Sequence, residues 1–207
     1  MAAHGFVALP FGYSQGGNAW NAGSIREVPL DRSVAALDAL RGLDITSGRV
    51  GLYGVSRGAE HALLLTSLMA REGIPGMADA VAAHSPPDCI CGAFDGRTFR
   101  DPGDPGWQAW DSAQRAWTWR ESSEALLPTM AIEIERYAGP LFLSHGTADS
   151  MWSVEMTRRL EARLQAHGRT PEVHYYEGED HILRSEAENM HHAHLIDFFE
   201  RHLSHDR

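Results

Sequence analysis

The stretch RVGLYGVSRGAEHALLL, residues 49–65, joins a short apolar run to a longer one through a serine between two glycines. The first run has the length of a buried strand, and the second is long enough for a helix. Ser56 stands between them in the pattern G-x-S-x-G, where Gly54 and Gly58 permit a tight strand-to-helix turn with the hydroxyl exposed at its tip. The stretch predicts a nucleophile, although G-x-S-x-G alone has many accidental matches.

Apolar runs and helical spacings alternate along most of the chain outside this stretch. We expect strands over 5–11, 49–55, 78–84, 139–146 and 172–178, and helices over 29–41, 59–72, 153–167 and 185–202. The last helix opens with the capping-box pattern Ser185-x-x-Glu188. Because parallel strands need long crossovers, strands separated by helices predict an open, mostly parallel α/β sheet with helices on both faces. Ligands bind such sheets beyond the carboxyl ends of the strands.

Three reactive side chains directly follow the ends of predicted strands. Ser56 follows GLYGV, Asp149 follows LFLSHGTA, and His181 follows HYYEGED. The order serine, acid, histidine is that of α/β-hydrolases, so we predict that His181 is the base and that Asp149 orients its ring. Glu179 and Asp180 are rival acids beside His181, but neighbouring residues of a turn seldom face each other.

The oxyanion hole is predicted only in part. The backbone N–H of Arg57, the residue after the nucleophile, is one expected donor. A second donor normally follows a strand that would fall before Met1, so the sequence predicts that N-terminal strands of the fold are missing. Either the run 5–11 pairs directly with 49–55 and amides of the loop 10–18 substitute, or the chain continues upstream. We favour the second explanation.

Composition narrows the function classes. The chain has 207 residues, 43% of them hydrophobic and 22% charged, as expected of a single globular domain. A formal net charge of −10 without a basic stripe argues against nucleic-acid binding. The sequence contains neither an apolar run of about 20 residues nor a secretory signal, which predicts a cytoplasmic protein without a membrane span.

Neither the cysteines nor the clustered histidines predict a metal or another cofactor. Cys89 and Cys91 form a single C-x-C, which cannot supply a four-ligand site, so two reduced thiols are expected. His191, His192 and His194 lie in one predicted helix without a carboxylate or thiolate at matching spacing, which favours a solvated helix face. His145 precedes the acid loop, and we expect it to pack or hydrogen-bond near the site.

The segment 89–136 interrupts the α/β alternation and could form a cap over the site. Its tryptophans could line an acyl pocket, but such spacing is more typical of a helix's own core; they are Trp107, Trp110, Trp117 and Trp119. Its arginines could meet the phosphates of a coenzyme A or form ordinary surface pairs, and the sequence leaves both open; they are Arg97, Arg100, Arg115 and Arg120.

Several stretches together resemble a known family: GLYGVSRGAEHALLL, AHSP, AWTWR, IEIERYAGPLFLSHGTADSMWS and YYEGEDH. They are similar to the C-terminal catalytic domain of the acyl-CoA thioesterase and bile acid-CoA:amino acid N-acyltransferase family, from about Gly5 to the C-terminus. The resemblance implies that Ser56 is the nucleophile, Asp149 the acid and His181 the base. G-x-S-x-G alone would indicate only the wider superfamily, which includes dienelactone-hydrolase-like enzymes.

This resemblance implies an acyl-CoA or related acyl thioester as substrate. The acyltransferase branch has cysteine where this chain has Ser56, and a seryl ester favours hydrolysis over transfer to an amine. The expected function is therefore a serine hydrolase that cleaves acyl thioesters through an acyl-enzyme. Two alternatives stay open: a carboxylesterase or dienelactone-hydrolase-like enzyme acting on oxygen esters, and a catalytically silent domain that binds an acyl ligand or a partner.

Overall fold

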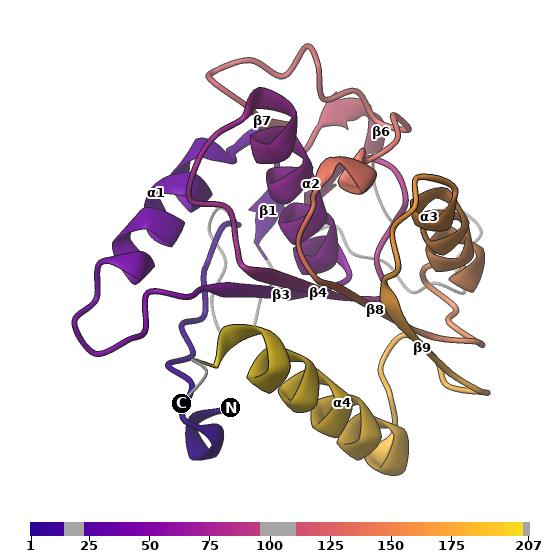
Figure 1. The fold of residues 1–207 in the computed structure, drawn as a ribbon. Coiled ribbons are helices and arrows are strands. Elements are labelled where there is room, and N and C mark those ends of the chain that lie inside the picture. Colours follow the sequence, from indigo (N-terminus) through magenta and orange to yellow (C-terminus); the bar gives the residue numbers. More distant parts are fainter. Residues whose placement is uncertain (15–22, 96–110, 205–207) are drawn as a thin grey trace.

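A four-stranded parallel sheet lies at the centre of the protein (Figure 1). The computed structural model describes residues 1–14, 23–95 and 111–204. The strands, in their order across the sheet, are β3 (Gly51–Val55), β4 (Ala80–His84), β8 (Leu141–Gly146) and β9 (Glu172–Tyr176). The four α-helices are α1 (Asp31–Arg41), α2 (Arg57–Glu72), α3 (Val154–Ala166) and α4 (Ser185–Leu203).

Helices cover both faces of this sheet, which confirms the predicted architecture. Figure 1 shows α2 and α3 on one face and α4 on the other. All five residues of β4 are buried, as a strand covered on both sides requires. Under the sheet, Leu195, Phe198 and Phe199 of α4 pack against Ala80, Ala82 and Phe142. Among the described helices, none is both long and apolar enough to cross a membrane.

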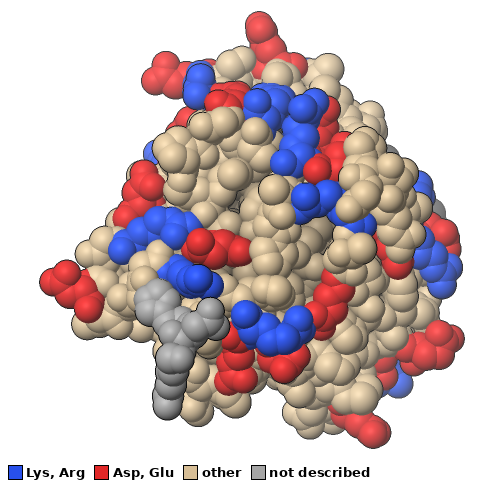
Figure 2. All heavy atoms as spheres, in the orientation of Figure 1, with Lys and Arg blue, Asp and Glu red and all other residues tan. Residues whose placement is uncertain are grey.

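Shorter strands flank the central sheet. They are β1 (Ser24–Ile25), β5 (Gly92–Asp95) and β6 (Asp111–Arg115), which are antiparallel, and the parallel pair β2 (Val28–Pro29) and β7 (Trp117–Thr118). Two 3-10 turns, η1 (Ala2–His4) and η3 (Ile134–Arg136), complete the described elements. On the face in Figure 2, acidic and basic side chains are interspersed, and no continuous basic stripe is visible there.

The segment 89–136 differs from the prediction. Trp117 is fully buried and Trp119 is 7% exposed, so both belong to the core, but Trp117 lies on β7 rather than in a helix. Arg120 forms an ordinary ion pair with Glu72, 2.8 Å long. Trp107, Trp110, Arg97 and Arg100 lie outside the described residues. That this segment covers the site stays a prediction.

The expected strand over 5–11 does not form. Val7, Leu9 and Phe11 are 53%, 60% and 42% exposed, and β4 is the partner strand of β3 within the described residues. The less favoured of the two explanations, in which 5–11 pairs directly with 49–55, is therefore wrong. A short apolar run becomes a strand only where a neighbouring strand offers hydrogen bonds, and hydrophobicity alone does not show whether one does.

The predicted capping box at the start of α4 does not form. Arg184, in an extended conformation, occupies the N-cap position, and Ser185 is already the first helical residue. No side chain caps the helix. The backbone N–H of Arg184 instead donates to Glu179 Oε2 at 2.8 Å, which ties the start of α4 to the preceding loop.

His191 of α4 is buried, contrary to the predicted solvated face. It is 3% exposed and its Nε2 lies 3.0 Å from the hydroxyl of Tyr53, while Ser144 Oγ and the Tyr176 hydroxyl each lie 3.4 Å from its Nδ1. Its ring centroid is 4.8 Å from that of His84. The described residues contain no group of three or more side chains arranged to hold a metal ion.

We expect these two buried histidines to make the fold sensitive to acid. Burial lowers the pKa of His191 to about 3 and that of His84 to about 4, against 6.5 in an unfolded chain. Below pH 6.5 the unfolded chain therefore binds protons that the folded protein does not. The free energy of unfolding should fall by roughly 2 kcal/mol per histidine between pH 6.5 and about pH 5, measured by urea denaturation.

His191→Gln should flatten this pH dependence because it removes one of the two titrations. The matched control is His192→Gln, since His192 is exposed on the same helix. Equal pH dependence in the wild type and in His191→Gln would contradict the explanation.

Candidate active site

Ser56 occupies a sharp turn between β3 and α2. Its backbone has φ 55° and ψ −117°, a conformation that non-glycine residues rarely adopt. Two hydrogen bonds fix the turn: Ser56 N donates to His84 O at 2.9 Å, and Glu60 N donates to Ser56 O at 3.0 Å. A strained non-glycine residue held by its surroundings is typical of functional sites, and here it places a hydroxyl at the carboxyl end of the sheet.

The two glycines around Ser56 have different roles. A Cβ on Gly54 would lie 2.1 Å from Gly58 O and 2.5 Å from Ala59 N, so the turn requires glycine at position 54. A Cβ on Gly58 would meet only the Tyr13 hydroxyl, at 3.8 Å, which is an ordinary contact. The close approach of the helix to the strand therefore depends on Gly54, and the expected steric role of Gly58 is not needed.

Asp149 and His181 meet at the neighbouring strand ends. His181 Nδ1 lies 2.8 Å from Asp149 Oδ2, and both side chains are almost completely buried, 8% and 0% exposed. Because Nδ1 faces a carboxylate, it carries the proton, and Nε2 is left free to accept one. Asp149, rather than Asp180 or Glu179, is thus the acid that contacts the imidazole.

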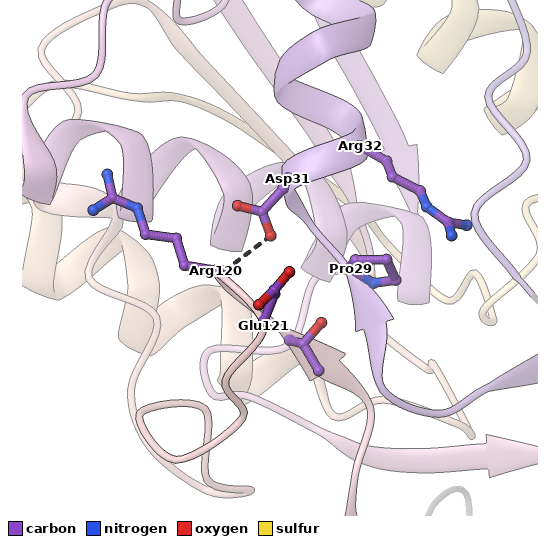
Figure 3. Close-up of a pocket in the computed structure, with 6 residues that line it drawn as sticks. Pro29, Asp31, Arg32, Arg120 and Glu121 are labelled. Atoms are coloured by element: carbon purple, nitrogen blue, oxygen red, sulfur yellow. Dashed lines mark hydrogen bonds between the residues drawn. The ribbon is translucent and has the colours of Figure 1, made fainter.

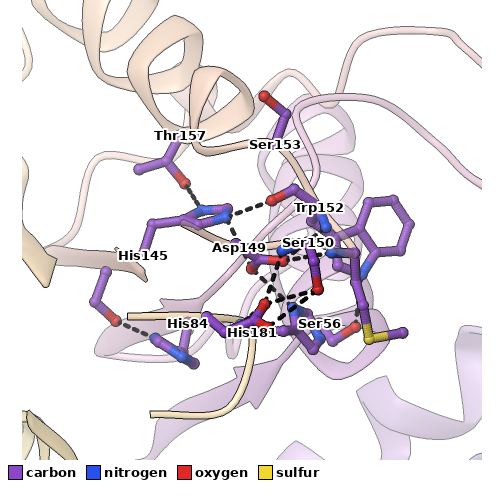
Figure 4. A network of polar contacts seen from close by, with 12 residues as sticks. Ser56, His84, His145, Asp149, Ser150, Trp152, Ser153, Thr157 and His181 are labelled. Carbon is purple, nitrogen blue, oxygen red and sulfur yellow. Dashed lines mark hydrogen bonds and ion pairs between the residues drawn. The ribbon is translucent and has the colours of Figure 1, made fainter. Parts of the chain in front are cut away.

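Asp149 is held by four donors (Figure 4). The backbone N–H groups of Met151 and Trp152 donate to Oδ1 at 2.9 and 2.8 Å, and His145 Nε2 lies 3.1 Å from Oδ2. Burial alone would raise the pKa of Asp149, but the bonds from His145, His181 and Trp152 N outweigh it and hold the pKa well below its ordinary value. The carboxylate is therefore ionised throughout the neutral range.

His145 supports the acid from the other side. Its Nε2 also lies 2.9 Å from Trp152 O, and its Nδ1 lies 2.7 Å from the Thr157 hydroxyl. Two acceptors at Nε2 place the proton there, so Nδ1 accepts from Thr157. The expectation that His145 hydrogen-bonds near the site agrees with these contacts.

Asp180 joins the two loops that carry Asp149 and His181. Its Oδ1 accepts from the backbone N–H of Ser150 and from that of His181, both at 2.7 Å. Gly146 allows the loops to approach, because a Cβ there would lie 2.4 Å from Glu179 O. Asp180 therefore fixes loop geometry, and no hydrogen bond joins its carboxylate to the imidazole among the described residues.

Ser56 Oγ forms its hydrogen bond with the indole of Trp152. Trp152 Nε1 donates to it at 2.8 Å, and the indole belongs to the same loop as Asp149. No hydrogen bond joins the Ser56 hydroxyl to His181 among the described residues. Hydrogen bonds nevertheless connect all three predicted side chains through Trp152 into the network of Figure 4.

A buried carboxylate, Glu60, lies one helical turn after the nucleophile. It is fully buried, its Oε1 accepts from Cys91 N at 2.7 Å and from Trp117 Nε1 at 2.9 Å, and Arg57 Nη1 lies 2.9 Å from Oε2. Burial raises its pKa, and the charge of Arg57 opposes that change. Glu60 ties the start of α2 to the segments that carry β5 and β7.

Sequence reasoning assigned no role to Trp152 or Glu60. Both lie in the stretches that carry the family resemblance, Trp152 three positions after Asp149 and Glu60 four positions after Ser56. The signal in the sequence was an aromatic residue and an acid at these spacings from Asp149 and Ser56.

The cysteines Cys89 and Cys91 are free thiols, and the backbone N–H of Cys91 donates to Glu60. Burial raises the pKa of Cys89 to about 11, which keeps this thiol protonated.

A hollow of about 610 Å³ lies elsewhere on the surface (Figure 3). Its lining residues are Pro29, Asp31, Arg32, Thr118, Arg120 and Glu121. Arg120 N donates to Asp31 Oδ2 at 2.9 Å across its wall. None of the lining residues belongs to the network around Asp149, so this hollow is separate from the candidate active site.

Comparison with known proteins gives a family match over nearly the whole chain. The sequence model of the prolyl oligopeptidase family matches residues 12–206. A search of curated proteins found no match to the chain. The superfamily part of the predicted resemblance is confirmed by fold and family, while the acyl-CoA thioesterase family is not what the match shows.

Solved structures with the α/β-hydrolase fold resemble this chain at low sequence identity. Dipeptidyl peptidase 4 of Porphyromonas gingivalis is 18% identical with a TM-score of 0.57, over 84% of this chain and 22% of that one. A puromycin-hydrolyzing peptidase of Mycobacterium tuberculosis is 15% identical with a TM-score of 0.56, over 86% and 26%.

A third similar structure is an α/β hydrolase, MGS-M1, from a deep-sea metagenome library. It is 13% identical with a TM-score of 0.52, over 83% of this chain and 63% of that one. The chain thus spans about a fifth to a quarter of the two peptidases and under two thirds of MGS-M1. These similarities establish the fold.

Proposed function

Since this chain belongs to the prolyl oligopeptidase family, a family of α/β-hydrolases of the serine-hydrolase type, we propose that it cleaves carboxylic acid derivatives through a Ser56 acyl-enzyme. The observation that carries this proposal is the 2.8 Å contact between His181 Nδ1 and Asp149 Oδ2 beside the strained turn at Ser56. It leaves His181 Nε2 unprotonated, which is the state that a general base requires.

The proposed reaction has two halves. The Ser56 hydroxyl gives its proton to His181 Nε2 while Oγ bonds to the substrate's carbonyl carbon, and the π electrons of the carbonyl move to its oxygen. When this oxyanion collapses, the bond to the leaving group breaks and His181 returns the proton to it. Water, deprotonated by His181, then releases the acid from Ser56 in the same way. Asp149 stabilises the imidazolium in both halves.

Arg57 N–H is the proposed backbone donor to the oxyanion. It belongs to the first turn of α2, whose N–H groups have no acceptor within the helix. The positive end of the helix dipole adds to this stabilisation of negative charge.

For the leaving group, two classes have support. The resemblance of the Ser56 and Asp149 motifs to acyl-CoA thioesterases supports a thioester, with an oxygen ester as the related alternative. Membership of a family named for an oligopeptidase, and structural similarity to two peptidases, supports a peptide amide. A comparison of kcat/KM for an acyl-CoA, the matching p-nitrophenyl ester and a peptide p-nitroanilide separates these classes.

We expect a fluorophosphonate probe to label the folded protein at Ser56. Oγ would displace fluoride from phosphorus with His181 accepting the proton, so the label requires the base as well as the nucleophile. Peptide mass mapping of the labelled protein locates the modified residue. Heat-denatured protein and Ser56→Ala are the controls, and neither should label.

This experiment also tests the silent-domain alternative. Folded wild-type protein that takes up no label, or takes it up equally at other serines, would refute the proposed serine hydrolase. Turnover of a p-nitrophenyl ester that disappears in Ser56→Ala would instead exclude a silent binding domain.

A further inference from the structure

Trp152 places a hydrogen-bond donor directly on the candidate nucleophile. Its indole Nε1 lies 2.8 Å from Ser56 Oγ, and the residue is 5% exposed. An indole N–H can only donate, so Ser56 Oγ is the acceptor and keeps its own proton available for His181. The contact therefore leaves the proposed proton transfer open.

Two hydrogen bonds fix the backbone of Trp152 in the loop between β8 and α3, which also carries Asp149. Its N–H donates to Asp149 Oδ1 at 2.8 Å, and its carbonyl accepts from His145 Nε2 at 2.9 Å. The backbone from which the indole projects is thus held by the same carboxylate that orients His181. A donor held in this way is preorganised, as electrostatic stabilisation of a transition state requires.

We propose that Trp152 is a catalytic residue whose indole N–H is a second oxyanion donor beside Arg57 N–H; this rests on the proposed function. When Ser56 Oγ bonds to the carbonyl carbon, the oxyanion becomes its neighbour on the same carbon. In this tetrahedral intermediate Oγ is an uncharged ether oxygen, while the oxyanion carries the negative charge and is the strongest acceptor nearby. A small rotation moves the indole N–H from the first oxygen to the second.

This side-chain donor differs in origin from the backbone donor Arg57 N–H. The donor comes from the loop after β8, which also carries the acid (Figure 4), so one loop both orients the base and stabilises the oxyanion. Loss of the indole N–H should therefore reduce catalysis without displacing Asp149, whose bond from Trp152 is a backbone bond.

The test compares Trp152→Phe with the wild type on a p-nitrophenyl ester. Phenylalanine keeps an aromatic ring in the site but has no N–H, so kcat should fall about 10² to 10³-fold with little change in KM. Affinity for a trifluoromethyl ketone, whose hemiketal with Ser56 bears an oxyanion, should fall in parallel. Trp152→His, which restores a ring N–H, should recover part of both losses.

Trp119→Phe is the matched control. It also removes an indole hydrogen bond, 2.7 Å to Glu72 at the far end of α2, about 22 Å along the helix from Arg57. Its kcat should equal that of the wild type. Equal or higher activity of Trp152→Phe would overturn the proposal, since it would make the contact neutral or inhibitory.

A measurement on the wild type covers the case in which Trp152→Phe does not fold. In ¹⁵N-tryptophan-labelled protein, one indole N–H resonance should move downfield when the trifluoromethyl ketone forms its hemiketal, and should not move in Ser56→Ala. Hemiketal formation without any indole shift would overturn the role of Trp152 alone. A wild type that neither turns over esters nor reacts with the ketone would overturn the proposed function itself.

Discussion

Ser56→Ala is expected to lower kcat/KM for an ester substrate by about 10⁶-fold. The hydroxyl is the only proposed group that can form the acyl-enzyme, and its loss leaves the Asp149–His181 contact without a nucleophile to activate. The protein should still fold, because Ala places the same Cβ in the turn as Ser does. Steady-state kinetics and a thermal melt of the same preparation check both parts.

Ser56→Gly isolates the strain of the turn. At φ 55° and ψ −117° glycine is favoured over any residue with a Cβ. We expect Ser56→Gly to be inactive and to unfold with a free energy roughly 1 kcal/mol higher than that of Ser56→Ala. If the two variants are equally stable, the turn stores no strain.

A double variant tests whether Ser56 and His181 act together. Adding His181→Ala to Ser56→Ala should cost almost nothing more, since residues that act as one unit lose their joint effect at the first substitution. Two independent losses that multiply would show that Ser56 and His181 do not cooperate.

The sequence was most informative where function depends on local pattern. The turn at Ser56 and the positions of Asp149 and His181 follow from apolar runs that end in reactive side chains, because parallel strands bring their carboxyl ends to one edge. Gly54 is required for a reason visible in sequence, a strand meeting a helix at once. Such features need no knowledge of distant neighbours.

Features that depend on distant partners could not be predicted in this way. The run 5–11 reads as a strand but finds no strand partner among the described residues, and His191 reads as solvated but packs against β3, β8 and β9. Glu60 is a charge in an apolar helix, and only the structure shows that it accepts from Trp117 and Cys91. The contact of Trp152 with Ser56 spans 96 positions of the chain.

Asp149→Asn should lower kcat by about 10⁴-fold at neutral pH while the protein still folds. The side chain keeps its shape, but one carboxylate oxygen becomes an NH₂ group, which only donates. The one remaining oxygen cannot accept both from His181 Nδ1 and from the backbone N–H groups of Met151 and Trp152. The imidazole is then driven toward the tautomer with its proton on Nε2, where it cannot act as a base. Kinetics on an ester measures the loss.

Stability gives this substitution a second signature with a definite sign. The folded pKa of Asp149 lies below the unfolded value of 3.8, so its ionised form stabilises the fold above pH 3.8 and this contribution is lost as pH falls further. Asp149→Asn should therefore be less stable than the wild type near neutral pH, and the difference should shrink below about pH 4. Denaturation at both pH values measures it.

Asp180→Asn decides between the two acids beside the base. Asp180 accepts from the backbone N–H groups of Ser150 and His181, whereas the imidazole Nδ1 bonds to Asp149. Replacement of Asp180 should therefore loosen the loops and cost far less than 10⁴-fold in kcat. Its pKa is also lowered, by the bonds from Ser150 N and His181 N, so both variants lose stability at neutral pH. Activity, rather than stability, therefore distinguishes them, and an equal loss of kcat in both would remove Asp149 from the role of orienting acid.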